Sequence, residues 1–362
     1  MTETPEQQAA AAEPPRPERH RGTAIFNLVV FVVGGGALWW LLRHQRWPEF
    51  RAMLTDVGWS GFGVVIGLEL ISLCCDAAAL HAFMRPEARM IRYWRVLGAQ
   101  AAGRAINGLT PGGALGEATK LTMLVRHAPR TRVLSSIVLL NLTQVYLTVM
   151  VMLVGIPVAL LLVDLPHGVK VTVGIGLAIL VPALVALGVL IQRGAVATLI
   201  GGMRRTRLIS PERAKTWRAK LAEVDRHIRE LHQNRSAGTW KGILWVAASK
   251  LISWCSLIVL LLLVGVTLTP RLVIGLLSVG QLVTWISAIV PFGLGVADGS
   301  NYALYGMLGA TGAQGLLITM LSRARMITIA VLGLIAMAGI YTHDRVRQTA
   351  MRRRLEALRT AT

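Results

Sequence analysis

Long apolar runs, separated by short polar and basic stretches, dominate the pattern of residues along the chain. Several runs reach the roughly 20 apolar residues that a helix needs to cross a bilayer. Six of them cover residues 23–42, 58–83, 133–162, 169–191, 240–265 and 313–340. The pattern predicts an all-α polytopic membrane protein with about six full transmembrane helices.

Two further apolar stretches, within residues 93–125 and 271–309, contain proline and several glycines and then a carboxylate. The interrupting residues are Pro111, Gly112, Gly113 and Gly116 before Glu117, and Pro291, Gly293 and Gly295 before Asp298. Proline removes a backbone donor, and glycine tolerates backbone that breaks a helix. At membrane depth such backbone survives only inside protein or beside a wet cavity. We therefore predict two re-entrant helical hairpins, with these prolines and glycines as gating elements.

Three segments outside the apolar runs are polar or basic. Residues 1–22 are rich in proline and polar side chains, which predicts a disordered tail. In residues 192–239 apolar positions recur at three- and four-residue steps among lysines and arginines. This is typical of a basic amphipathic helix lying on the anionic leaflet or on the bundle. Residues 342–362 are predicted to form a basic, helical tail. The segment 192–239 divides the membrane part into a first half, 23–191, and a second half, 240–341.

The distribution of charge predicts the orientation. Hydrophobic residues make up 54% of the chain against 15% charged, yet the formal net charge is +20. Because lysines and arginines lie mainly in loops and tails, this is the positive-inside pattern, and we predict contact with anionic lipid headgroups rather than nucleic acid. Both termini are then cytoplasmic, at a bacterial inner membrane. Arg43, Arg46 and Arg51 fall on the outer side, against this rule.

The two halves align with each other at a fixed offset. Glu69-Leu-Ile-Ser-Leu-Cys74 matches Lys250-Leu-Ile-Ser-Trp-Cys255, an offset of 250 − 69 = 181. The same offset pairs Gln100 with Gln281, Glu117 with Asp298 and Gln144 with Arg325. The charge argument turns the two units in opposite directions. We therefore predict an inverted-topology repeat, an arrangement that gives a transporter two related half-sites.

Several ionisable residues fall inside the predicted spans and hairpins, where each costs a few kcal/mol or more unless it is paired or wet. The predicted substrate-binding residues are Arg104, Asn107, Glu117, Lys120, Lys250, Asp298 and Arg325. Glu69 and Asp76 share a helical face, and each is predicted either to pair with a cation or to serve as a proton site. A Glu69–Lys250 ion pair that fixes the repeats together, and a cavity lined by both residues, are compatible alternatives. The excess of cations and the opened helix N-termini suit an anionic ligand such as a lipid phosphate.

Three of these assignments have a structural alternative. Glu117 near a helix N-terminus is favoured by the helix dipole, with Lys120 as its i, i+3 partner, and Asp298 has the same choice. Arg323 and Arg325, two residues apart, point in roughly opposite directions on a helix. We expect Arg325 to line a cavity and Arg323 to be paired or structural.

Motifs for soluble catalysis are absent from the sequence. It has no Asp-x-Asp pair, P-loop, Gly-x-Ser-x-Gly elbow or histidine cluster. The cysteines Cys74, Cys75 and Cys255 lie inside predicted spans without metal-ligand spacing. We predict no metal, no cofactor and no enzymatic activity. Membrane-embedded group transfer using Glu117 and Arg104 is the alternative.

The stretch Asn107-Gly-Leu-Thr-Pro-Gly-Gly-Ala-Leu-Gly-Glu-Ala-Thr-Lys120, followed by Pro291-Phe-Gly-Leu-Gly-Val-Ala-Asp298, resembles the lysylphosphatidylglycerol synthase transmembrane-region family of flippase-like proteins. The resemblance covers about residues 20–342. In the family pattern Gly-Glu is followed three residues later by a basic residue, usually Arg. Lys120 keeps that charge but loses bidentate phosphate binding, and Asp298 stands where Glu is common.

The resemblance implies a stand-alone member that translocates lipid between leaflets, without the aminoacyl-transferase domain of full-length relatives. We predict that the chain moves an anionic or modified lipid across the inner membrane. The alternatives are a membrane-embedded lipid-modifying enzyme and a non-catalytic scaffold for envelope lipid synthesis, since some stand-alone relatives are associated with hopanoid or glycolipid pathways. Two kinds of protein partner are compatible with this prediction: a second copy of the chain, and proteins of lipid synthesis.

Overall fold

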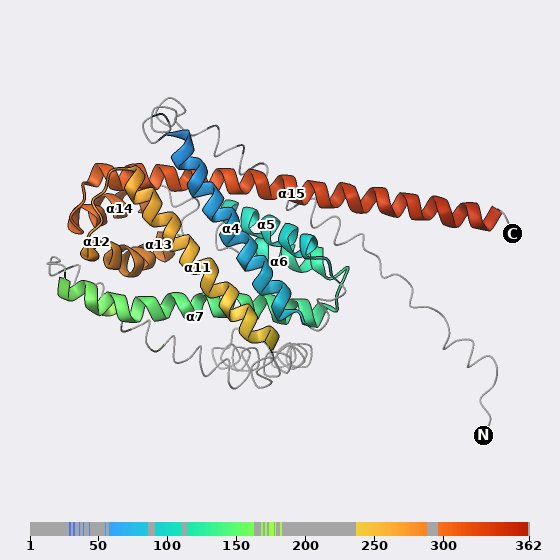
Figure 1. The fold of residues 1–362 in the computed structure, drawn as a ribbon, viewed down its shortest axis with the longest axis horizontal. Helices are drawn as coiled ribbons and strands as arrows, with labels where there is room; N and C mark the ends of the chain where they lie inside the picture. The colour runs from blue at the N-terminus through green and yellow to red at the C-terminus, as the bar shows by residue number, and fades with distance from the viewer. Residues whose placement is uncertain are drawn as a thin grey trace, which may run out of the picture.

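The computed structural model describes residues 58–85, 91–110, 114–162, 237–287 and 296–360, with isolated positions between 29 and 55 and between 168 and 182. Within these ranges the chain is helical and contains no strand (Figure 1). The predicted tail 1–22, most of the spans 23–42 and 169–191, and residues 192–236 of the amphipathic segment lie outside the described residues. The all-α fold class is confirmed for the part described.

Four of the described helices are long and apolar enough to cross a membrane. They are α4 (Trp59–Phe83), α7 (Arg130–Leu162), α11 (Ala237–Leu263) and α15 (Gly312–Thr360). Each corresponds to a predicted span, and the ends agree within three residues except at the C-terminus of α15. There the predicted last span and the basic tail form one uninterrupted helix of 49 residues.

The two broken stretches separate short helices, as the prolines and glycines predict. The first helix pair consists of α5 (Tyr93–Leu109) and α6 (Ala114–Leu124). The second consists of the consecutive helices α12 (Pro270–Gly275), η2 (Leu276–Gly280) and α13 (Gln281–Ser287), followed by α14 (Val296–Met307). The prolines and glycines between the arms, 111–113 and 291–295, lie outside the described residues.

Glycines allow α5 and α6 to approach closely. A Cβ atom at Gly116 would overlap the backbone oxygen of Gly103 and the side chain of Asn107. A Cβ atom at Gly103 would in turn overlap the aliphatic stem of Lys120. Small residues at helix crossings permit such backbone approach in membrane proteins. The two arms of this pair therefore pack directly on each other.

The long helices of each half pack against the other half. α4 lies along α11 in the antiparallel sense, since Gly61 is next to Leu263 and Gly242 is next to Phe83. α15 lies along α5, where Gly333 packs on the backbone oxygen of Ala101. α7 lies against α12 and η2, where a Cβ at Gly155 would overlap the side chain of Ser278.

The two helix pairs open toward opposite ends of the bundle. α5 begins, and α6 ends, at the end where α4 terminates and α7 and α11 start (Figure 1). α12 begins and α14 ends at the other end, where Arg271 Nη2 donates to the backbone oxygen of Met307 at 3.0 Å. This is the arrangement that an inverted repeat requires. Re-entrance into a bilayer, and the equivalence of the two units, stay predictions.

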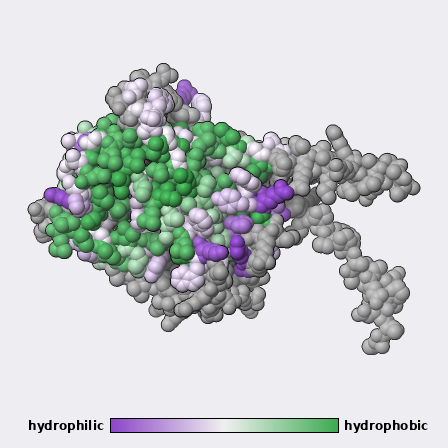
Figure 2. Space-filling model, viewed as in Figure 1, coloured by the Kyte–Doolittle hydropathy of each residue, from purple (hydrophilic) through white to green (hydrophobic). Residues whose placement is uncertain are grey.

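Basic side chains gather at one end of the bundle, which we call the basic end. They are Arg85, Arg92, Arg95, Arg126, Arg130, Arg132 and Lys241. α15 leaves the bundle at the same end, where the Arg126 guanidinium lies 5.9 Å from the ring centroid of Tyr341. Figure 2 shows a broad apolar surface over the middle of the bundle, with hydrophilic residues gathering mainly toward the side from which α15 emerges. This is the charge distribution that the positive-inside rule describes.

Candidate functional site

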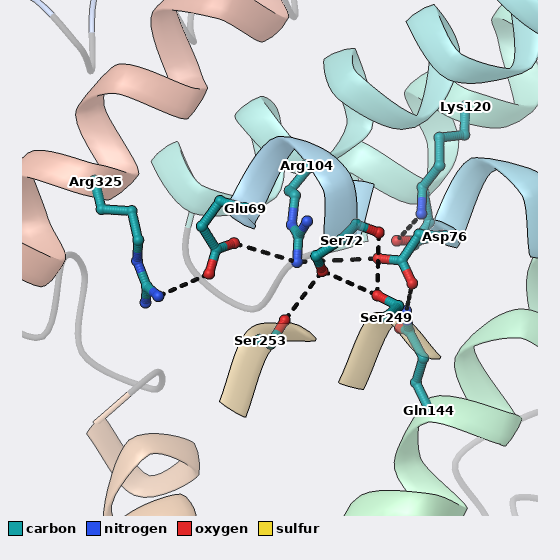
Figure 3. A network of polar contacts seen from close by, with 10 residues as sticks. Glu69, Ser72, Asp76, Arg104, Lys120, Gln144, Ser249, Ser253 and Arg325 are labelled. Atoms are coloured by element: carbon teal, nitrogen blue, oxygen red, sulfur yellow. Dashed lines mark hydrogen bonds and ion pairs between the residues drawn. The ribbon is translucent and has the colours of Figure 1, made fainter. Parts of the chain in front are cut away.

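Glu69 on α4 is bound by arginines from two other helices. Glu69 is only 7% exposed. Arg325 Nη1, on α15, donates to Glu69 Oε1 at 2.7 Å, and Arg104 Nη2, on α5, lies 3.9 Å from Glu69 Oε2 (Figure 3). A buried carboxylate is stable only when it is paired, so these contacts join α4 to α5 and α15.

Asp76, two turns further along α4, is even more enclosed at 2% exposed. Gln144 Nε2, on α7, donates to Asp76 Oδ1 at 3.0 Å. Arg104 Nη2 lies 3.9 Å from Asp76 Oδ2, the same distance that separates it from Glu69. Since 3.9 Å exceeds the length of a hydrogen bond, Arg104 lies between the two carboxylates without donating to either.

Three serines lie between the two acids, where α4 crosses α11 (Figure 3). Ser72 Oγ is 3.0 Å from Ser249 Oγ and 3.0 Å from Ser253 Oγ. Ser249 also donates to the backbone oxygen of Ser72 at 3.1 Å. These small side chains let the helices approach closely and satisfy one another's hydroxyl groups.

Lys250, between two of these serines, belongs to the same group of charges. It is half-buried and interacts electrostatically with Asp76 and Arg104. We call Glu69, Asp76, Arg104, Lys250 and Arg325 the charged network. The helices α4, α5, α11 and α15 supply its members.

The expected Glu69–Lys250 ion pair does not form. Glu69 pairs with Arg325 and Arg104 instead. The reason is the antiparallel crossing, which reverses the order of residues on α11 relative to α4. Because Ser72 is opposite Ser249 and Ser253, Lys250 is placed beside Asp76 rather than beside Glu69.

The first helix pair holds an adjoining group of polar residues. Asn107 Nδ2 donates to Glu117 Oε1 at 2.9 Å, and the Gly116 amide donates to Asn107 Oδ1 at 2.8 Å. Lys120 Nζ lies 2.7 Å from the same Glu117 oxygen, and Lys120 is only 3% exposed. The i, i+3 partnership expected of Glu117 and Lys120 is therefore formed, and Asn107 joins it to α5.

The second helix pair has its own ion pair. Arg323 Nη2, on α15, donates to Asp298 Oδ2, on α14, at 2.8 Å. Asn301 Nδ2 donates to Thr319 Oγ1 at 2.8 Å between the same helices. Arg323 and Arg325 thus reach different acids, as their spacing predicts, and Arg323 is paired as expected.

The structure brings most of the predicted site residues into two neighbouring groups, with Asp298 paired separately. Ser249 was not singled out from the sequence, although it contacts Ser72 directly. Gln144 was aligned with Arg325, but its hydrogen bond to Asp76 was not anticipated. The predicted inverted repeat bears only on the Ser72–Ser249 contact, which joins the two halves, because Gln144 and Asp76 both belong to the first half.

Comparison with known families gives one match. A family model described as the lysylphosphatidylglycerol synthase TM region matches residues 27–335. The chain belongs to this family. The resemblance inferred from the two glycine-rich motifs is thereby confirmed.

Membership in the lysylphosphatidylglycerol synthase TM-region family and the four apolar helices make the chain an integral membrane protein of a lipid-related family. No curated protein and no solved structure matches the chain. The buried charges described above therefore lie within the membrane domain that defines the family.

Proposed function

We propose that this protein translocates an anionic or modified lipid across the inner membrane, with the lipid headgroup passing through the charged network. The observation that carries the proposal is a cluster of five charged side chains where four helices meet: the acids Glu69 and Asp76 are buried, and the cations Arg104, Lys250 and Arg325 are half-buried. Ionisable groups within a membrane domain are costly, and they mark substrate or ion pathways. In a lipid-related family, a lipid headgroup is the polar substrate that such a pathway serves.

The charges of the network favour an anionic headgroup. Its cations Arg104, Lys250 and Arg325 outnumber the carboxylates of Glu69 and Asp76 by three to two. Arg104 makes no hydrogen bond to any described residue, so its five N–H donors can bind a ligand. Guanidinium groups bind phosphate and carboxylate oxygens through paired donors.

The opposed helix pairs supply a route for alternating access. One pair opens toward the basic end and the other toward the opposite end. In inverted-repeat transporters, rocking of one unit against the other exposes a central site to each side in turn. In this proposal the two helix pairs are the gates, the basic end is cytoplasmic, and so are both termini.

The test is a leaflet assay in proteoliposomes with fluorescent phosphatidylglycerol and a neutral lipid. We expect the wild type to move phosphatidylglycerol preferentially. Arg325→Gln removes a cation and leaves Glu69 underpaired, so it should slow movement by about tenfold or more. Glu117→Gln should also reduce movement. Lys241→Gln, which removes an exposed cation at the basic end, is the matched control and should retain activity.

Other outcomes point to other functions. A wild type that moves no lipid while folded contradicts translocation. Appearance of a new lipid species on a thin-layer plate identifies a lipid-modifying enzyme instead. A folded protein in which network substitutions alter only the melting temperature is the result expected of a scaffold.

A further inference from the structure

Buried polar atoms without partners follow one face of α5. Gln100 is only 5% exposed, yet its Oε1 has no hydrogen-bond partner among the described residues. One turn along, Arg104 Nη1 is likewise buried and unpartnered. Residues four apart lie on the same helical face, about 6 Å apart along the axis. This face therefore presents a free acceptor beside a free donor.

A third such atom belongs to α6, whose Glu117 is held by Asn107 on the next turn of this α5 face. Asn107 holds Glu117 through Oε1, whereas Glu117 Oε2 is buried and has no partner. Buried polar atoms are nearly always hydrogen-bonded, so unpaired ones call for a ligand or water. The sequence of groups is acceptor, donor, acceptor. A matching ligand has an anionic acceptor flanked by hydrogen-bond donors.

The net charge limits the charge of that ligand. The network together with the Glu117–Lys120 pair contains the cations Arg104, Lys120, Lys250 and Arg325 and the carboxylates Glu69, Asp76 and Glu117. The difference is 4 − 3 = +1 with all groups ionised. A phosphodiester carries one negative charge and balances it. A phosphomonoester carries about −1.5 to −2 at neutral pH and exceeds it.

We infer that Gln100 and Arg104 select a phosphodiester lipid whose head carries hydrogen-bond donors such as hydroxyl groups. Arg104 binds the phosphodiester oxygens, and Gln100 accepts a hydrogen bond from the head, which makes Gln100 a specificity-determining residue. This inference rests on the proposed function and narrows its substrate class. It excludes phosphomonoester lipids and phosphodiester lipids whose head lacks a donor.

The experiment compares three fluorescent lipids in proteoliposomes that contain the full chain. Phosphatidylglycerol has one charge and head hydroxyls, phosphatidylcholine has no head donor, and phosphatidic acid is a monoester. We expect the wild type to move phosphatidylglycerol about tenfold faster than the other two, as the loss of one hydrogen bond implies. Gln100→Met keeps the side-chain length but removes the acceptor, so the ratio of phosphatidylglycerol to phosphatidylcholine rates should approach one.

Two further variants separate selectivity from folding. Gln281→Met changes the aligned glutamine of the second helix pair and should keep the wild-type ratio. Arg104→Lys keeps the charge but loses the directed fork, so it should slow phosphatidylglycerol and phosphatidylcholine alike, since both are phosphodiesters, and leave the ratio of their rates unchanged. Melting temperatures in detergent, with and without short-chain forms of each lipid, report folding and binding independently of transport.

The outcomes distinguish this inference from the proposed function. Equal rates for the three lipids in the wild type, or an unchanged ratio in folded Gln100→Met, overturn the selectivity and leave translocation standing. If the wild type moves no lipid, the melting temperatures with and without each lipid show whether a selective binding site is still present. Stabilisation by phosphatidylglycerol alone, lost in Gln100→Met, supports the selective site without translocation. Equal stabilisation by all three lipids, or none, overturns both.

Discussion

Ser72 and Ser253 are 181 positions apart in the chain, and their hydroxyl oxygens are 3.0 Å apart. The same offset, 250 − 69 = 181, aligns the two halves of the sequence. On a two-fold axis a residue meets its own counterpart, which is the relationship seen here. We therefore predict that the axis of the inverted repeat passes through the α4–α11 crossing.

The first prediction tests this crossing. Ser72 is fully buried between the helices, so Ser72→Leu forces them apart and should cost about 1–3 kcal/mol of stability. Ser72→Ala removes only hydrogen bonds and should cost about 1 kcal/mol. Thermal unfolding in detergent measures both. Ile71→Ala, at an exposed neighbouring position, is the control. If Ser72→Leu has the same melting temperature as Ile71→Ala, the close crossing of α4 and α11 is contradicted.

The second prediction concerns the contact between α5 and α6. Gly116→Ala places a methyl group against the backbone oxygen of Gly103, which cannot rotate away. We expect a loss of about 1–3 kcal/mol and reduced lipid movement, because the arms must separate. Gly67→Ala, on a face of α4 where a Cβ meets nothing within 4 Å, is the matched control. It should be neutral or stabilise by up to about 1 kcal/mol, since alanine favours helix.

The third prediction is a double-mutant cycle on Glu69 and Arg325. Their 2.7 Å contact is largely buried, with side-chain exposures of 9% and 28%. Glu69→Gln leaves Arg325 without its carboxylate, and Arg325→Gln does the reverse. We expect the double variant to lose less stability than the sum of the two single losses, with a coupling free energy of about 1–3 kcal/mol. Additive effects on the unfolding free energy would show that the pair is not energetically joined.

The fourth prediction tests the orientation by cysteine labelling. In a chain whose three cysteines are replaced, single exposed positions are changed as Arg130→Cys and Lys241→Cys at the basic end, and Thr267→Cys and Thr311→Cys at the other. An impermeant thiol reagent on intact cells should label only the latter two, because we propose that the basic end is cytoplasmic. The reverse pattern would invert the topology, and labelling of all four would exclude a spanning arrangement.

The fifth prediction exchanges the charges of Asp298 and Arg323. Either single reversal, Asp298→Arg or Arg323→Asp, places like charges at a 2.8 Å contact and should abolish lipid movement. The double exchange restores an ion pair and should recover part of the activity in the leaflet assay. If the double variant is as inactive as the singles while folded, one of these residues has a role beyond pairing.

Hydropathy was enough to predict the four described spans, because the length and apolar character of a spanning helix are imposed by the bilayer. The end of α5 at Leu109, just before Pro111, was also predictable, since proline and glycine act on their own backbone. The sequence also predicted a helical tail after residue 342, but not that the last span and this tail form one continuous helix, α15.

The contacts between side chains of the charged network were harder to predict than which residues belong to it. The cost of burying charge identified Glu69, Arg104 and Arg325 from sequence alone. Which cation contacts Glu69 depends on the direction in which α4 and α11 cross, and local sequence carries no record of that direction. The position of Lys250 beside Asp76 is thus a property of the tertiary structure.

The uninterrupted α15 has the length of a lever. Its 49 residues span about 73 Å at 1.5 Å per residue, far more than the thickness of a bilayer core. Arg323 and Arg325 lie in its first third and contact different partners, Asp298 and Glu69. A tilt of about 5° about Arg325 would displace the far end, roughly 50 Å away, by about 4–5 Å. If α15 tilts during transport, its C-terminal end would show a larger displacement than the site itself, and a fluorescent pair outside the membrane could measure it.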